Sequence, residues 1–196
     1  MSTLFRLLIA CITLSASLAF AADPLVITRG TDRAIPVAVV PFGVAGAGLP
    51  DDPARIIAAD LYNSGLFSPI AREHMISMPS RPDEIIYRDW RAVGAQYLLI
   101  GDVRALGDGR YQLQYHLFNV TSEQQVHAGT LSGTAQQIRD MSHHIADQVH
   151  EKVTGIRGAF STKLLFVSAS GPVNDRRYAL YRADYDGARA VTLLQS

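Results

Sequence analysis

The chain has 196 residues, and its 18 basic and 18 acidic side chains cancel to a formal net charge of zero. This balance gives no electrostatic support for binding nucleic acid or an anionic membrane surface. A chain of this length can build one medium-sized domain and a small second unit.

Residues 1–21 have the organisation of a secretory signal peptide. A positive charge, Arg6, precedes an apolar segment over residues 7–18 that is too short for a stable membrane anchor, and Ala-Phe-Ala at 19–21 fits the usual cleavage pattern. We therefore expect export and cleavage after residue 21 or 22. The only cysteine, Cys11, leaves with this segment, so the mature chain has neither disulfides nor a cysteine nucleophile.

The first predicted elements of the mature chain are two strands separated by a polar break. Residues 25–28 form a short strand-like tip, and residues 29–33 are polar. Residues 35–42 are apolar and rich in β-branched side chains, which predicts a buried strand. The glycine-rich residues 43–48 are expected to form a flexible loop.

The next segment has the start and stop signals of a helix. Asp51 or Asp52 is expected to cap its N-terminus, Pro53 takes the first helical position, and Gly65 lies just beyond its end. Between these signals, five residues follow helical spacing: Ile56, Ile57, Asp60, Leu61 and Ser64. A second buried strand is predicted over residues 67–71.

A short helix and three strands come next. The helix is predicted over residues 84–93, with Trp90 as its anchor in the core. The strands are predicted over residues 97–106, 111–120 and 125–133. Short turns join them, which is typical of antiparallel hairpins.

A long amphipathic helix follows the hairpins. Residues 134–137 match a capping box, and Gly155 ends the pattern. Apolar residues recur along it at intervals of three and four: Ile138, Met141, Ile145, Val149 and Val153. The order of elements up to this point predicts an α/β fold in which a mixed β-sheet packs with α-helices.

The pattern changes after Gly158. Short strands are predicted over residues 163–168, 178–183 and 190–194, and the Asp-Tyr-Asp-Gly sequence at 184–187 has the composition of a turn. Three short strands with such a turn are typical of most of one β-propeller blade. One blade cannot bury its own faces, so we expect an incomplete blade that belongs to a longer protein.

A glycine pattern near the first helix suggests a phosphate site but fits it poorly. Gly43, Gly46 and Gly48 lie between a strand and a helix, yet their spacing differs from that of a dinucleotide-binding loop. Asp51 and Asp52 would also repel a phosphate at the same helix end. A plain loop is the better interpretation.

Three potential metal ligands recur along the long helix. His143, Asp147 and His150 are spaced by four and three residues, which places them on one helical face. We expect this face to be solvated and to lack a fourth ligand. A surface pair between His143 and Asp147 is therefore favoured, and neither a metal nor a cofactor is predicted.

The remaining motifs are weaker. Asp184, Asp186 and Gly187 match the start of a calcium-binding loop, but the later glutamate is missing, and a turn between two strands explains them better. Ser161 lacks the G-x-S-x-G elbow of a serine hydrolase. The residues therefore predict no catalytic site and no enzyme.

Several long segments, taken in order, resemble the TolB family of the Tol-Pal system. They include Ile-Pro-Val-Ala-Val-Val-Pro-Phe at 35–42, the helix and strand at 56–67, Tyr-Arg-Asp-Trp-Arg-Ala at 87–92, and the strand and turn at 178–187. The resemblance extends from about residue 25 to the end of the chain. Ordered matches of this length are more specific than any single short motif.

The resemblance implies an N-terminal α/β domain followed by a β-propeller. It also implies a periplasmic scaffold that links the inner-membrane protein TolA to the outer-membrane lipoprotein Pal during cell division, and that some colicins exploit for import. In the family, the mature N-terminus binds the C-terminal domain of TolA, whereas Pal and colicins dock mainly on the propeller. Neither nucleic acid binding nor direct membrane insertion is expected.

On this basis the chain divides into a signal peptide (1–21), a TolB-like N-terminal α/β domain (22–157) and a partial first propeller blade (158–196). The TolA-binding segment of the family maps onto Asp23, Pro24, Leu25, Val26, Ile27, Thr28, Arg29 and Gly30. The alternative is a periplasmic propeller hydrolase or ligand-binding protein, which would need site residues from several blades.

Overall fold

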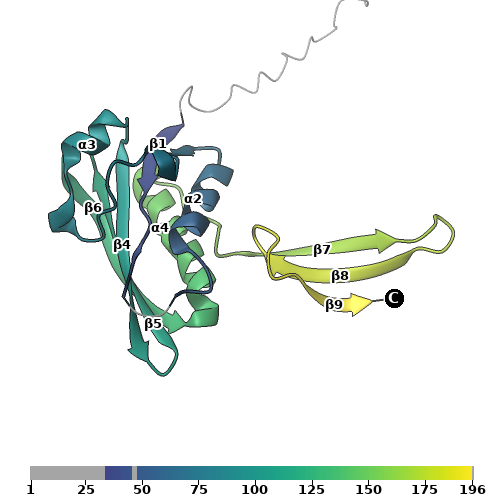
Figure 1. The fold of residues 1–196 in the computed structure, drawn as a ribbon. Coiled ribbons are helices and arrows are strands. Elements are labelled where there is room, and N and C mark those ends of the chain that lie inside the picture. The colour runs from purple at the N-terminus through teal and green to yellow at the C-terminus, as the bar shows by residue number, and fades with distance from the viewer. Residues whose placement is uncertain (1–33, 46–47, 196) are drawn as a thin grey trace, which may run out of the picture. The chain divides into compact units, whose positions relative to one another are not determined.

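The computed structural model describes residues 34–45 and 48–195 (Figure 1). Six strands form one sheet with the order β3-β1-β4-β5-β6, and β2 pairs with β4 outside this path. The strands are β1 (Ile35–Val39), β2 (Gly43–Ala45), β3 (Phe67–Pro69), β4 (Tyr97–Gly107), β5 (Arg110–Asn119) and β6 (Gln124–Thr134).

The sheet is mixed, as predicted. β1 lies between β3 and β4 and is parallel to both. The connection from β1 to β3 contains α2 (Pro53–Asn63), which returns the chain to the same end of the sheet. β4, β5 and β6 form consecutive antiparallel pairs. The turn between β4 and β5 has positive φ at Gly107, Asp108 and Gly109, a conformation that glycine adopts readily. The predicted hairpins are therefore confirmed.

The segment after β1 differs from the expected flexible loop. Residues 43–45 form β2, which pairs in parallel with β4 in the register Gly43–Asp102. Gly43 is required there, since a Cβ atom would lie 2.8 Å from Cβ of Ser80. The pairing depends on a strand much later in the chain, so local composition did not reveal it. β1 and β3 also end earlier than predicted, at Val39 and Pro69.

The two longer helices begin and end at the predicted signals. In α2, the backbone N–H of Arg55 donates to Oδ1 of Asp52 at 3.3 Å, and Gly65 follows the helix with a φ of 73°. The second is α4 (Ile138–Thr154), which ends at Gly155 with a φ of 75°. Both ends use glycine because an L side chain is strained at such a φ.

The third helix, α3 (Tyr87–Ala92), is shorter than the predicted helix over 84–93. The predicted start is a separate 3₁₀ turn, because the carboxylate of Glu84 accepts hydrogen bonds from two preceding backbone N–H groups. The expected core anchor is confirmed, since Trp90 is fully buried.

The sheet carries an apolar layer on each face. α2 and α4 cover one face (Figure 1) and pack with strand residues such as Val37 and Leu99. Trp90 of α3 packs on the other face with Leu98 and Ile100. Neighbouring strand residues enter different cores because successive side chains point to opposite faces. α2 and α4 contact each other over the first face, which brings their facing polar residues together.

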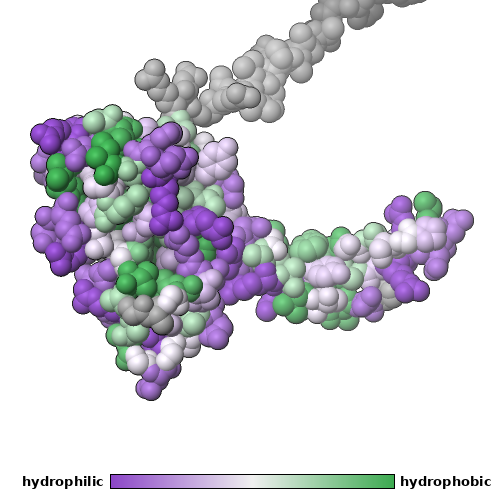
Figure 2. Space-filling model, viewed as in Figure 1, coloured by the Kyte–Doolittle hydropathy of each residue, from purple (hydrophilic) through white to green (hydrophobic). Residues whose placement is uncertain are grey.

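The last three strands form an antiparallel sheet in the order β7 (Lys163–Ser170), β8 (Arg177–Asp184) and β9 (Val191–Gln195). The predicted turn after β8 is confirmed, with a φ of 83° at Gly187. Large apolar side chains of this sheet are exposed: Leu164, Leu165, Phe166, Val167, Val191, Leu193 and Leu194. Figure 2 shows green, hydrophobic surface along this sheet.

The predicted signal peptide and the strand-like tip at 25–28 lie outside the described residues. Within the described ranges, no helix is long and apolar enough to cross a membrane.

Candidate functional site

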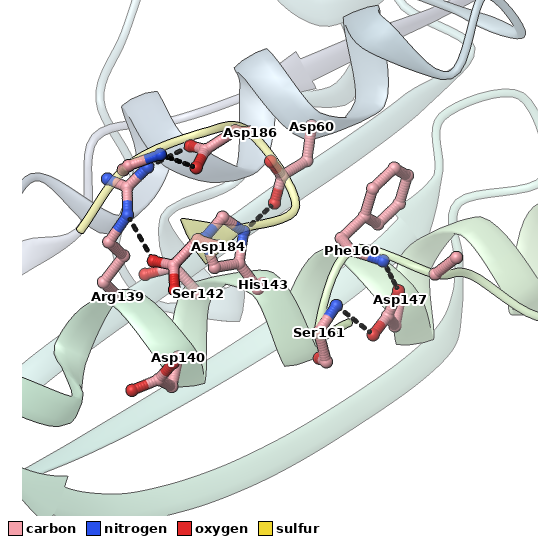
Figure 3. Close-up of polar contacts among 12 residues, drawn as sticks. Asp60, Arg139, Asp140, Ser142, His143, Asp147, Phe160, Ser161, Asp184 and Asp186 are labelled. Atoms are coloured by element: carbon pink, nitrogen blue, oxygen red, sulfur yellow. Dashed lines mark hydrogen bonds and ion pairs between the residues drawn. The ribbon is translucent and has the colours of Figure 1, made fainter. Parts of the chain in front are cut away.

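A buried acid–imidazole pair links the two helices that cover one face of the sheet. Asp60 of α2 and His143 of α4 are each 1% exposed, and Oδ2 of Asp60 lies 2.6 Å from Nδ1 of His143 (Figure 3). Asp60 lies on the apolar side of α2 near Ile57 and Leu61, so helix formation brings the carboxylate into the core. Burial raises the pKa of Asp60, although the hydrogen bond with His143 acts in the opposite direction.

The turn after β8 brings two more carboxylates close to this pair. Asp184 is buried, and a ring nitrogen of His143 lies within 4.8 Å of carboxylate oxygens of both Asp184 and Asp186. Arg139, one turn before His143 on α4, lies 3.2 Å from Asp184 and also pairs with Asp186. α4 thus presents a base and an imidazole to the same turn (Figure 3).

Two further bases complete the ion pairs around Asp184. Nζ of Lys163 lies 2.8 Å from Oδ1 of Asp184, and Nε of Arg189 lies 2.7 Å from Oδ2. Both bases also reach Asp140 of α4, at 3.1 Å and 2.5 Å respectively. These ion pairs define a set of six residues that we call the junction: Arg139, Asp140, Lys163, Asp184, Asp186 and Arg189.

Ion pairing outweighs burial at Asp184. Burial acts to raise the pKa of this carboxyl group, but hydrogen bonds from Arg189 and Lys163 lower that pKa to about 2. The hydrogen bond from Arg189 likewise lowers the pKa of Asp140, and the hydrogen bond to Asp184 raises the pKa of Lys163. The junction therefore favours charged carboxylates together with charged bases.

The predicted pattern of His143, Asp147 and His150 does not form a ligand set. The expected surface pair between His143 and Asp147 is wrong, because His143 pairs with Asp60. The expectation of a solvated face is also wrong, since both histidines are buried. The apolar stripe alone did not show that α2 and the chain after α4 would cover this side of the helix.

Asp147 and His150 instead hold the chain that follows α4. The carboxylate of Asp147 accepts hydrogen bonds from the backbone N–H groups of Phe160 and Ser161, at 2.7 Å and 3.1 Å (Figure 3). Nδ1 of His150 lies 2.8 Å from the carbonyl oxygen of Ile156, to which it donates. Both side chains therefore have structural roles that fix the exit from α4.

A different group of possible metal ligands lies close together, but its surroundings do not suit a cation. His143, Asp184 and Asp186 offer ligand atoms within 4.8 Å of one another. Both carboxylate oxygens of Asp184 already accept hydrogen bonds from junction bases, and Asp186 accepts one from Arg139. A divalent ion would have to displace these positive groups. The geometry supports an ion-paired contact instead of a metal centre.

The buried pair has the composition of two members of a catalytic triad, in which an acid orients a histidine base. Nε2 of His143 is buried, however, and has no hydrogen-bond partner in the described part of the chain. The hydroxyl of the adjacent Ser142 donates to the carbonyl oxygen of Ile138 at 2.8 Å, so it is not placed as a nucleophile. The arrangement is suited to holding a proton and charge between elements.

Sequence reasoning missed most of the junction. Arg139, Lys163 and Arg189 belong to no motif, and residues 184–187 were identified only as a turn. Asp60 did carry a usable signal, because a carboxylate within the apolar side of a helix needs a buried partner. The predicted TolA-binding segment lies outside the described residues and stays a prediction.

Comparisons with known proteins agree on one family. A family model described as the TolB amino-terminal domain matches residues 24–126. The chain is 56% identical to the Tol-Pal system protein TolB of Pseudomonas aeruginosa over 198 residues, which cover 100% of this chain and 46% of that protein. It is 59% identical to a TolB of Pseudomonas fluorescens over 174 residues, which cover 88% of this chain and 40% of that protein.

A solved structure has the same fold. The crystal structure of TolB from Acinetobacter baumannii matches with a TM-score of 0.72 and 29% sequence identity, covering 84% of this chain and 39% of that chain. The chain spans a little under half the length of the curated relatives that it matches.

Proposed function

Because this chain belongs to the TolB family of Tol-Pal system proteins, we propose that it is part of a periplasmic scaffold that links TolA to Pal. The observation that carries this proposal is the similarity of the whole chain to TolB of Pseudomonas aeruginosa. The scaffold binds other proteins and catalyses no reaction. It supports outer-membrane invagination and integrity during cell division, and some colicins exploit it for import.

The proposal includes β7, β8 and β9 as part of the first blade of a β-propeller, the region where Pal and colicins mainly dock in the family. The antiparallel order, the turn at 184–187 and the exposed side chains of Leu165, Val167 and Leu194 support it. Propeller blades bury such faces against neighbouring blades. Pal binding is therefore proposed for the full-length protein.

TolA binding is assigned to residues 23–30 of the exported chain. Leu25, Val26 and Ile27 are apolar and strand-prone, and the polar residues 29–33 separate them from β1. An extended segment of this kind can add a strand to the edge of a partner's sheet. Ordering the segment costs entropy, so we expect a dissociation constant on the order of 1 µM.

The test measures binding of the full-length protein to the C-terminal domain of TolA by isothermal titration calorimetry. Deleting residues 23–33 should abolish binding and leave the melting temperature nearly unchanged, because these residues precede β1. Val26→Asp should weaken binding at least about tenfold. Asp32→Asn, in the polar break, is the control and should bind normally. Unchanged affinity of the deletion variant would show that TolA binds elsewhere.

Export and cleavage of the signal peptide are tested separately, by determining the N-terminus of the periplasmic protein. Mass spectrometry of the periplasmic protein should find a mature N-terminus at Ala22 or Asp23, because Ala-Phe-Ala at 19–21 fits the cleavage pattern. An intact Met1 form as the main periplasmic species would contradict the signal peptide.

A further inference from the structure

The junction is balanced in charge without the buried pair. Its three acids and three bases are joined by ion pairs, five of them between 2.5 and 3.2 Å. Any net charge on the neighbouring Asp60–His143 pair is therefore not compensated by the junction. The pair is neutral as a carboxylate with an imidazolium, or as a carboxylic acid with a neutral imidazole. Loss of one proton leaves a buried negative charge, which is costly.

The carboxylates close to the His143 ring favour the same protonation state. Nε2 of His143 has no hydrogen-bond partner in the described part of the chain, whether or not it carries a proton, so the charges near the ring decide which form is favoured. The charged groups close to the ring are the carboxylates of Asp184 and Asp186, within 4.8 Å of one of its nitrogens. A proton on Nε2 would place a positive charge beside them. The docked turn therefore stabilises the protonated pair.

The other ionisable groups that face the imidazole do not replace this proton. Arg139 on α4 is already paired with Asp184 and Asp186. The ring of Tyr185, from the turn itself, meets the imidazole edge-on with centroids 6.2 Å apart. Burial raises the pKa of the Tyr185 hydroxyl, so this group stays neutral at ordinary pH. Lys163, Arg189 and Asp140 are paired within the junction.

We propose that the contact between α4 and the turn at 184–187 is linked to a proton: the turn docks while the Asp60–His143 pair is neutral, and loss of one proton from the pair weakens docking. When the turn leaves, the carboxylates that stabilise the proton leave with it. Because the docked form binds the proton more tightly, docking becomes less favourable as pH rises. One linked proton changes the docking constant by up to about tenfold per pH unit.

Hydrogen exchange of the turn in the full chain tests this. The backbone N–H groups of Asp184, Gly187 and Ala188 are hydrogen-bonded within the turn. Their protection should fall at least about tenfold as pH is raised from about 5 to about 9. In the double variant Asp60→Asn/His143→Gln the protection should not depend on pH, since neither amide titrates. His144→Gln, which changes the exposed neighbouring histidine, should behave like the parent chain.

Nuclear magnetic resonance of the parent chain tests the proposal even if the double variant does not fold. The ring ¹⁵N shifts of His143 and the carboxyl ¹³C shift of Asp60 report how many protons the pair holds. One proton should leave the pair over the same pH range in which protection of the turn falls. The proposal is overturned if protection in the parent chain is constant over that range, or if it falls equally in the double variant.

Discussion

At Asp184, three bases surround one buried carboxylate, and its charge is what holds them together. The pKa of this group is about 2 in the folded chain, below the ordinary value of 3.8. Because folding favours the charged form, the stabilisation is complete above about pH 4 and is lost as pH falls through about 2. We expect the free energy of unfolding, measured with urea, to decrease by about 2 kcal/mol over this range through this one group.

A charge-removing variant isolates this contribution. Asp184→Asn keeps the shape of the side chain, so it should be less stable near neutral pH and lose less stability on acidification. Asp83→Asn is the control, because the ion pair of Asp83 with Arg81 is largely exposed and contributes little. An acid profile of Asp184→Asn that matches the parent would contradict the assignment.

Asp147 gives a second prediction for a single side chain. Its carboxylate satisfies two backbone N–H groups after α4, at Phe160 and Ser161. Asp147→Ala leaves both donors without this acceptor, so we expect a loss of about 1–3 kcal/mol in the free energy of unfolding. Glu151→Ala, one turn later on α4, serves as the control and should change stability by less than about 0.5 kcal/mol. Equal effects of the two variants would argue against the assigned role of Asp147.

The residues that sequence reasoning placed correctly act over short distances along the chain. Asp52 caps a helix that begins at the next residue, and Gly65 ends that helix with a positive φ. Asp60 and His143 are 83 positions apart, and their contact exists only after α2 and α4 pack together. A pattern along one helix could therefore not identify the partner of His143.

At the scale of elements, the packing around β4 leaves no room for a side chain at Gly101. A Cβ atom at Gly101 would lie 2.5 Å from the carbonyl oxygen of Gln114 and 2.7 Å from the ring of Phe42. Gly101→Ala therefore forces a strand or the ring to move, and we expect a loss of about 1–3 kcal/mol in the free energy of unfolding. Gly48→Ala is the control, since nothing lies within 4 Å of its Cβ position. Similar stability of the two variants would contradict the packing at Gly101.

The elements that could be predicted have strong periodic signals of their own. α2, α4 and the β4–β5–β6 hairpins have apolar spacing together with caps or turns, and these signals agree locally. β2 lacks such a signal because its three residues become a strand only by pairing with β4. The start of α3 was misplaced because the side chain of Glu84 stabilises a competing 3₁₀ turn.

For the molecule as a whole, the α/β fold and the family could be inferred from sequence, since long ordered segments carry both. The junction could not, because its ion pairs join α4 to residues of β7, of the end of β8 and of the region between β8 and β9. The sequence interpretation placed these strands in a different domain from α4. No contact between their charged side chains and α4 was therefore predicted.

The position of Phe160 suggests that the N-terminal domain extends beyond the boundary predicted from sequence. Phe160 follows the boundary predicted at residue 157, yet it is buried in the core with side chains of α2 and α4. We expect chains of residues 22–157 and 22–162 both to unfold cooperatively in urea, because the sheet and its covering helices are present in each. The shorter chain should be less stable by about 3–5 kcal/mol, since it lacks a buried phenylalanine. It also lacks the two N–H donors that bind Asp147.

Phe160→Ala in the longer chain separates these two causes, because it removes the ring and keeps both backbone donors. This variant should account for most of the stability difference if core packing is the main term. A non-cooperative transition in the 22–162 chain would show that the α/β domain depends on β7, β8 and β9 to fold. The contacts of that region with the domain, which include the ion pairs of Arg139 and Asp140 and the packing of Tyr185 on the core, would then be needed for folding.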